Sequence, residues 1–148
     1  MSKDERLRLD SQLCFSIYAC SREIIGLYRP LLEDMGLTYP QYLVMLVLWE
    51  HTECSVKELG QLLYLDSGTL TPMLKRMEAN DLVRRFRSQK DERVVLVSLT
   101  EKGASLKEKA YCIPEELFAK SGLSADEMND MLTRLQALTK QMNLFKAK

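Results

Sequence analysis

The four cysteines, Cys14, Cys20, Cys54 and Cys112, are the first residues to test for chemistry. Their spacing contains no C-x-x-C pair and no zinc-ligand pattern, and the chain has a single histidine, so we expect no metal site and no cofactor. Cys14 and Cys20 would lie about 240° apart around a helix and roughly 9 Å apart along it, too far for a disulfide without unfolding. We interpret Cys20 and Cys54 as packing residues.

Cys14 has a tyrosine within reach on the same predicted helix. Cys14 and Tyr18 are four residues apart, so their side chains can meet on one helix face. Tyr28 is fourteen residues from Cys14, roughly 21 Å along a continuous helix, and cannot touch it within one chain. In an antiparallel two-fold dimer of these helices, the partner subunit's Tyr28 could. The alternative is that these tyrosines cap the edge of a buried core.

A second candidate site lies on the predicted helix that begins between Ser67 and Thr69. Capping residues precede it, Pro72 is tolerated only near its start, and Leu70, Met73, Leu74 and Met77 form one apolar stripe. The opposite face carries Gly68, Pro72, Lys75, Arg76 and Ala79. Such a face suits the major groove of DNA, where the first turn reaches base edges and basic groups reach phosphates. Taken alone, the helix also fits an ordinary amphipathic surface helix.

Charge is unevenly distributed along a chain whose net charge is zero. Between Lys75 and Arg93 there are seven Lys or Arg and four Asp or Glu, a local excess of +3. This pattern indicates a localised nucleic-acid contact, with a solvated charged face as the alternative. The first ten residues hold six charges, and the longest apolar run, 42–49, is too short to span a membrane. We therefore expect a cytoplasmic protein with no membrane contact.

The pattern of caps and apolar residues predicts a mainly α fold. We expect a first helix over 8–35, kinked or divided at Pro30 and ended by Gly36, and a buried helix capped by Thr38 over 39–49. A capping box at Ser55 and Glu58 opens a short helix, and residues 64–66 turn into the helix described above. Helix, tight turn and helix make a helix-turn-helix.

Two β-rich runs, 82–87 and 93–99, follow with a polar tip over 88–92, which predicts a hairpin wing. Thr100 should cap a helix that ends near Ile113, because Pro114 follows. A second capping box, at Ser124 and Glu127, opens a terminal helix. Its apolar residues repeat every three and four positions and predict a dimer seam; they are Met128, Met131, Leu135, Leu138, Met142 and Phe145. The predicted class is a winged helix-turn-helix, mainly α with a small β-hairpin wing, dimerising through its N- and C-terminal helices.

This order of elements resembles the MarR (multiple antibiotic resistance regulator) family. Three stretches, 39–49, 64–78 and 91–100, together with Gln12-Leu13-Cys14-Phe15, look like the organic-hydroperoxide-sensing repressors (OhrR) of that family. The motifs include Tyr-Pro-Gln-Tyr, Tyr-Leu-Asp-Ser-Gly-Thr-Leu-Thr-Pro-Met-Leu-Lys-Arg-Met-Glu and Asp-Glu-Arg-Val-Val-Leu-Val-Ser-Leu-Thr. The resemblance covers nearly the whole chain. It implies a homodimer that binds a near-palindromic double-stranded operator and releases it when an organic hydroperoxide oxidises the protein.

The resemblance also implies roles for particular residues. Cys14 would be the peroxide sensor, with Tyr18 from its own chain and Tyr28 and Tyr39 from the partner donating hydrogen bonds that favour the thiolate. Cys112 would be the resolving thiol, or else a bystander. At the wing, Arg93 would enter a minor groove, held by Asp91, with a surface ion pair as the alternative.

The whole chain, 1–148, would be one domain of this type. Its DNA-binding lobe would lie at about 55–99, and its dimerisation helices at about 8–35 and 100–146. The candidate DNA-binding residues lie on the second helix of the helix-turn-helix and on the hairpin; they are Asp66, Ser67, Thr69, Thr71, Pro72, Lys75, Arg76, Arg85, Lys90, Asp91 and Arg93.

Two other functions remain open from the residues. One is a regulator of the same fold released by a small phenolic ligand, with Cys14 inert. The other is a cysteine-dependent peroxidase, which is weakened because His51, the single histidine, has no recognisable nucleophile partner. We therefore predict that the protein is not an enzyme.

Overall fold

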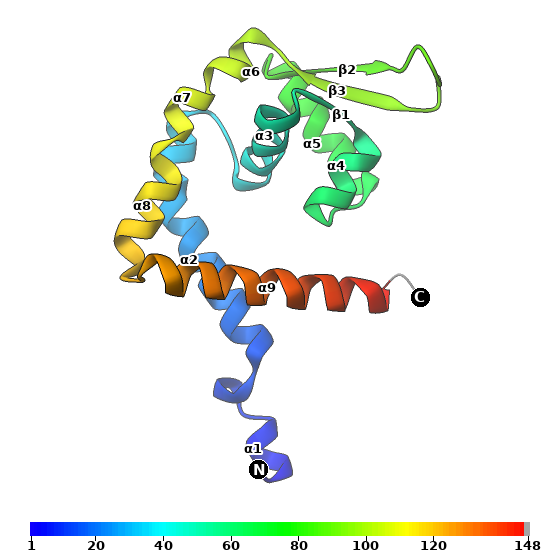
Figure 1. Ribbon diagram of the computed structural model, residues 1–148. Helices are drawn as coiled ribbons and strands as arrows, with labels where there is room; N and C mark the ends of the chain where they lie inside the picture. The colour runs from blue at the N-terminus through cyan, green and yellow to red at the C-terminus, as the bar shows by residue number, and fades with distance from the viewer. Residues whose placement is uncertain (147–148) are drawn as a thin grey trace. The chain divides into compact units, whose positions relative to one another are not determined.

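The computed structural model describes residues 1–146, which form helices and one small sheet (Figure 1). The elements in chain order are α1 (Lys3–Arg6), the 3-10 turn η1 (Leu9–Ser11), α2 (Leu13–Asp34), α3 (Tyr39–His51), β1 (Glu53–Ser55), α4 (Val56–Leu63), α5 (Ser67–Ala79), β2 (Val83–Arg87), β3 (Val95–Leu99), α6 (Glu101–Ser105), α7 (Lys107–Ala110), α8 (Cys112–Ser121) and α9 (Ala125–Lys146). They group into two compact units, Met1–Tyr111 and Cys112–Lys148. No helix of the described part is long and apolar enough to cross a membrane.

The first long helix begins later than predicted and is continuous. The backbone of Gln12 is extended, and its side-chain amide donates to the carbonyls of Arg6 and Arg8 at 2.7 and 2.9 Å, so α2 starts at Leu13 rather than at residue 8. Pro30 lies inside α2 without dividing it, at the loss of one backbone hydrogen bond. Gly36 then ends the helix with a φ of 71°, as predicted.

Helix α3 is the centre of the first unit and contacts both α2 and α4. Thr38 and Gln41 form the capping box that starts it, which confirms Thr38 as the cap. Val44, Met45 and Leu48 are fully buried. The core continues into α4, α5 and the sheet through Leu59, Leu70, Leu74, Met77 and Val97, none of which is exposed.

The predicted helix-turn-helix is confirmed by α4 and α5. Ser55 and Glu58 form the capping box of α4, and Tyr64 ends that helix in the left-handed region with a φ of 56°. Asp66 caps α5 by accepting a hydrogen bond from the backbone N–H of Thr69. The turn is so close to α4 that a Cβ placed on Gly60 would lie 2.6 Å from the carbonyl oxygen of Leu65.

The wing is the hairpin of β2 and β3, extended by one strand that the sequence analysis missed. The sheet is antiparallel in the order β1-β3-β2, with Val83 opposite Leu99 and Arg87 opposite Val95. Both hairpin strands are shorter than predicted, so residues 88–94 form a longer tip. The strand β1 has only three residues between two helices, too few to show an alternating pattern.

The loop that follows α5 is held by the segment that follows the sheet. Three consecutive carbonyl oxygens, those of residues 80–82, accept hydrogen bonds from the Nζ of Lys102, the Oγ1 of Thr100 and the backbone N–H of Thr100, in that order. Gly103 packs directly against the last of these carbonyls, where a Cβ would collide with it. The carbonyl of Gly103 in turn accepts from the indole Nε1 of Trp49, at 3.0 Å. Gly103 of α6 therefore links the loop after α5 to Trp49 of α3.

The C-terminal helices differ from the prediction in one respect. The predicted single helix ending near Ile113 is wrong: α6 and α7 are short, and α8 begins at Cys112 and runs past Pro114. Proline is accommodated there because it sits in the first turn of α8, where its N–H would have had no helical partner. Helix α9 starts at the predicted capping box of Ser124 and Glu127. Among the described residues, α9 has no buried side chain.

Candidate DNA interface and redox site

Helix α5 presents the predicted face to solvent. Leu70, Met73, Leu74 and Met77 are buried against the core, as the apolar stripe predicted. The opposite side leaves the candidate reading residues exposed, including Ser67, Thr69, Pro72, Lys75 and Arg76, with Thr71 half-buried. Asp66 is exposed, but its Oδ1 is engaged by Thr69 N–H at 2.7 Å, and this hydrogen bond lowers the pKa of its carboxyl. The Asp66 carboxylate therefore serves as the N-cap of α5.

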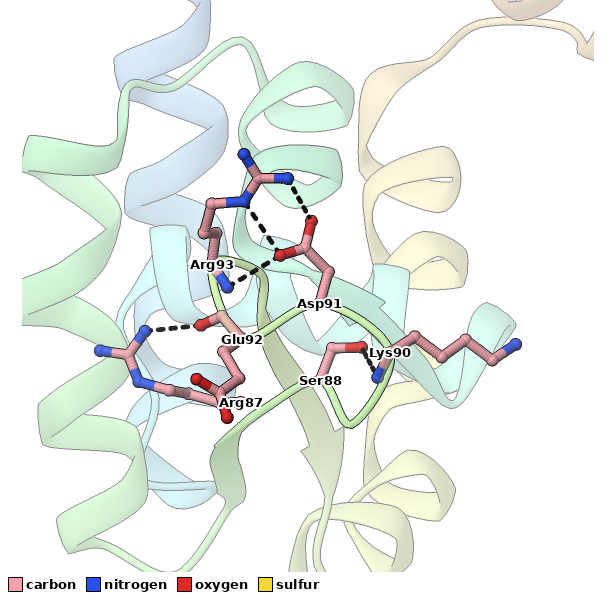
Figure 2. Close-up of polar contacts among 6 residues, drawn as sticks. All are labelled: Arg87, Ser88, Lys90, Asp91, Glu92 and Arg93. Atoms are coloured by element: carbon pink, nitrogen blue, oxygen red, sulfur yellow. Dashed lines mark hydrogen bonds and ion pairs between the residues drawn. The ribbon is translucent and has the colours of Figure 1, made fainter.

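The tip of the wing holds Arg93 by a fork of hydrogen bonds, shown in Figure 2. The Nε and Nη2 of Arg93 donate to the two carboxylate oxygens of Asp91 at 3.0 and 3.1 Å, and the backbone N–H of Arg93 donates to Oδ1 at 3.1 Å. These donors lower the pKa of the Asp91 carboxyl. The Arg93 side chain is nonetheless 91% exposed.

Two further contacts shape the same tip (Figure 2). Arg87 donates from Nη1 to the carbonyl of Glu92 at 2.8 Å, and the hydroxyl of Ser88 accepts from the backbone N–H of Lys90 at 3.2 Å. The Lys90 side chain extends away from the loop into solvent. The tip therefore carries Arg93 and Lys90 on a loop fixed by its own hydrogen bonds.

Arg85 differs from the other basic candidates, because its guanidinium is engaged inside the protein. Its Nε and Nη2 donate to Oε1 of Glu78, at 3.3 and 3.1 Å, and its backbone N–H donates to Oε2 at 2.8 Å. These bonds, the backbone one foremost, lower the pKa of the Glu78 carboxyl. Sequence reasoning did not single out Glu78; the available signal was an acid and an arginine seven residues apart across a helix-to-strand turn.

The thiol of Cys14 and the ring of Tyr18 both lie exposed near the start of α2. The guanidinium carbon of Arg22 lies 5.4 Å from the centre of the Tyr18 ring, a cation–π contact. No hydrogen bond joins Cys14 to Tyr18 in the described part of the chain. In a single chain the Cys14 thiol and the Tyr18 ring are therefore accessible to solvent.

Tyr28 and Tyr39 come together at the other end of α2, with Tyr42 as a third ring that sequence reasoning missed. The ring centres of Tyr28 and Tyr39 are 6.1 Å apart and stacked, and Tyr42 lies 6.3 Å from Tyr28 and 6.2 Å from Tyr39. Burial raises the pKa of both Tyr28 and Tyr39, so each phenol stays protonated and able to donate. One chain thus assembles the tyrosine pair but does not bring it to its own Cys14.

The other cysteines lie in different surroundings. Cys54 is buried, as predicted, and burial raises the pKa of its thiol to about 11, which keeps it protonated. Cys20 is exposed on α2, so its interpretation as a packing residue is wrong for the single chain. Cys112 is exposed at the start of α8. The described residues contain no group of three or more His, Cys, Asp or Glu that could hold a metal ion.

Comparison with known proteins gives consistent matches. Residues 26–110 match the family described as transcriptional regulator SarA/Rot. The chain is 50% identical to the organic hydroperoxide resistance transcriptional regulator of Bacillus subtilis, over 96% of this chain and 97% of that one. Among solved structures, reduced AbfR bound to DNA matches with a TM-score of 0.81 at 37% identity, covering 95% of this chain and 99% of that one. Disulfide-formed AbfR matches with a TM-score of 0.61 at 38% identity, covering 93% and 96%. AbfR is a Staphylococcus epidermidis protein.

The fold and its exposed basic face define a winged helix-turn-helix regulator of transcription rather than an enzyme. Within that class, the chain belongs to the MarR family, in the branch of the organic hydroperoxide resistance regulators.

Proposed function

We propose that this protein is a dimeric transcription repressor that senses organic hydroperoxides through Cys14 and then releases its operator. The observation that carries the proposal is the presence, in one chain, of a winged helix-turn-helix with an exposed basic face and an exposed thiol at the start of α2. Its relatives include a regulator of organic hydroperoxide resistance and a regulator seen on DNA in its reduced form. Because its target is the chromosome, we place it in the cytoplasm.

DNA binding is assigned to α5, which would be the recognition helix, and to the wing. The first turn of α5 would face base edges in the major groove, and Lys75 and Arg76 would pair with phosphates. Arg93 would enter the adjacent minor groove, where a narrow groove attracts a guanidinium. Of the three guanidinium nitrogens of Arg93, Asp91 accepts from Nε and Nη2, so Nη1 stays available for DNA. The fork orients the guanidinium and leaves its outer edge free.

A second copy of the chain would complete the molecule. The single chain leaves large apolar side chains exposed on α2 and α9; these include Leu13, Phe15, Ile17, Met131, Leu135, Met142 and Phe145. Burying such surfaces against a two-fold partner stabilises a dimer. Two recognition helices related by a two-fold axis read a near-palindromic operator. In that dimer the partner's Tyr28 and the partner's Tyr39 would reach Cys14.

The sensing reaction needs a thiolate, a peroxide and a proton from water. The Cys14 thiolate attacks the terminal O–H oxygen of the hydroperoxide, the O–O bond breaks, and the other oxygen leaves as an alkoxide that takes up a proton from water to become the alcohol. The sulfur is oxidised by two electrons to sulfenic acid, and the peroxide is reduced by two. The tyrosine hydroxyls then lose the anionic acceptor that they had stabilised, and the junction between the two α2 helices must repack.

A thiol can then fix the oxidised arrangement. It attacks the sulfenic sulfur, a disulfide forms, and water leaves. Cys112 of the other subunit is one candidate for this resolving thiol, and a small cellular thiol is the alternative. A change in the separation of the recognition helices is poorly tolerated by half-sites one helical turn apart, so operator affinity falls.

The experiment is a gel-shift or anisotropy titration on the DNA upstream of the protein's own gene, with and without cumene hydroperoxide. Wild-type protein should bind and be released by the peroxide, whereas Cys14→Ser should bind equally well and stay bound. Cys112→Ser should change release only if Cys112 is the resolving thiol. Normal release of Cys14→Ser by peroxide would contradict the sensing role of Cys14, whatever the Cys112 variant does.

A further inference from the structure

One carboxylate joins the recognition helix to the wing. Glu78 lies in the last turn of α5, and all three hydrogen bonds to its carboxylate come from Arg85, the central residue of β2. Arg85 pairs with Val97 of β3, and β2 is one of the two edge strands of the sheet. The outward N–H of Arg85 therefore has no strand partner, and Glu78 satisfies it. We call this pair the Glu78–Arg85 clamp.

The clamp is better shielded from solvent than the groups assigned to DNA. The Arg85 side chain is 24% exposed and that of Glu78 is 38%, whereas the Arg93 side chain is 91% exposed. Glu78 holds Nε and Nη2 of Arg85 just as Asp91 holds the same two atoms of Arg93, so the two arginines differ in exposure and not in which nitrogens are engaged. Because only 24% of the Arg85 side chain is exposed, its guanidinium is less well placed than that of Arg93 to reach a phosphate.

Because Glu78 is negatively charged, the direction in which its neutralisation changes DNA affinity tests its role. An acid on the recognition helix repels phosphates, so simple electrostatics predicts that neutralising it strengthens DNA binding. We propose that Glu78 and Arg85 are positioning residues, which fix the hairpin relative to α5 so that α5 and Arg93 can contact DNA together. On this basis Arg85 is not itself a DNA ligand. The inference rests on the DNA-binding part of the proposed function.

The expected loss of operator affinity follows from holding two DNA contacts, those of α5 and Arg93, on one rigid body. When α5 is bound, a fixed hairpin holds Arg93 at a high effective concentration beside the minor groove, and a loosened hairpin does not. The most that can be lost is the whole contribution of Arg93. Breaking the clamp should therefore weaken operator binding by roughly tenfold, and by no more than Arg93→Ala does.

The test is a double-mutant cycle on a labelled operator, with the affinity and its salt dependence measured for each variant. Glu78→Gln and Arg85→Gln should each weaken binding in the wild-type background. In the Arg93→Ala background neither should weaken it further, nor change the slope of log affinity against log salt concentration. The slope does not depend on the active fraction of protein, so a partly unfolded preparation cannot imitate the result.

A matched control is Glu92→Gln, which removes one negative charge from the wing tip. The Glu92 carboxylate makes no hydrogen bond or ion pair with another described residue, so this variant should bind as well as wild type or better. Two results would overturn the inference. One is Glu78→Gln binding as tightly as Glu92→Gln. The other is Arg85→Gln lowering the salt slope by about one in the Arg93→Ala background, as the loss of a phosphate contact does. If wild-type protein does not bind the operator at all, the proposed function fails first.

Discussion

Replacing Gly60 with alanine tests how closely α4 approaches the turn of the helix-turn-helix. The new Cβ would lie 2.6 Å from the carbonyl oxygen of Leu65 and 3.5 Å from Cδ1 of Leu70. The Leu65 carbonyl belongs to the backbone of the turn, and the N–H of Leu65 already donates to the carbonyl of Gly60 at 3.0 Å. Neither side can therefore yield without moving α4 against α5.

Two opposing effects decide whether Gly60→Ala raises or lowers the free energy of unfolding. Alanine is favoured over glycine inside a helix by ~1 kcal/mol. Forcing an extra carbon into a packed site costs ~1–3 kcal/mol, and a contact this short with a backbone atom belongs at the upper end. The net free energy of unfolding should therefore fall by about 1–2 kcal/mol. For a chain of this size, that lowers the melting temperature by roughly 2–8 °C.

The assay is thermal unfolding by circular dichroism at one fixed protein concentration, since a dimer melts at a concentration-dependent temperature. Gly26→Ala is the matched control, because a Cβ at Gly26 in α2 meets nothing within 4 Å. The control should be as stable as wild type or gain up to ~1 kcal/mol. A Gly60→Ala protein that melts at or above the wild-type temperature would refute the close approach.

Three further predictions concern the wing, a buried thiol and assembly. Asp91→Asn should weaken operator binding by up to roughly fivefold. Hydrogen bonds from Arg93 lower the folded-state pKa of Asp91, so the fork is fully present above the unfolded-state pKa and is lost only as pH falls through the lowered value. The drop in operator affinity caused by Asp91→Asn should therefore be the same at pH 5 as at pH 7. Cys54, with a pKa of about 11, should be alkylated at pH 8 more slowly than Cys20, as followed by peptide mass mapping, and equal rates would contradict its burial. Sedimentation at micromolar concentration should give a dimer, and Leu135→Glu, on the exposed seam of α9, should give monomers.

The features that sequence predicted best are those decided within four residues. Thr38, Ser55 and Ser124 cap helices as predicted, and Asp66 proves to be the cap among the polar residues at the start of α5, because a side-chain oxygen and the N–H three positions later are fixed by local geometry alone. The periodicity of α5 likewise identified its buried side, since one face of a helix in this setting must pack. These local signals, taken in order, were enough to define the winged helix-turn-helix.

The features that sequence did not predict depend on distant partners. Strand β1 exists because β3 offers it a free edge, more than forty residues further along the chain. The Glu78–Arg85 clamp needs the path of the intervening turn, which neither residue encodes alone. The third ring, Tyr42, shares a face of α3 with Tyr39 because the two are three residues apart, but its contact with Tyr28 depends on how α2 packs against α3. Approach of the tyrosine pair to Cys14 stays a prediction, because it requires a second chain.

The loop after α5 is bonded to the segment after the sheet through its main-chain carbonyls, and this has a consequence for mutational tolerance. Every residue has a carbonyl, so substitutions of Asn80 leave its acceptor in place, and Asp81 is restricted only by its positive φ of 59°. The facing segment has less freedom, because Thr100 and Lys102 donate through their side chains and a Cβ at Gly103 would collide with the carbonyl of Leu82. Random mutagenesis should therefore find variants at position 80 easily and almost none at 103. Two residues in contact can accept substitutions at very different rates when one contributes a backbone atom and the other a side chain.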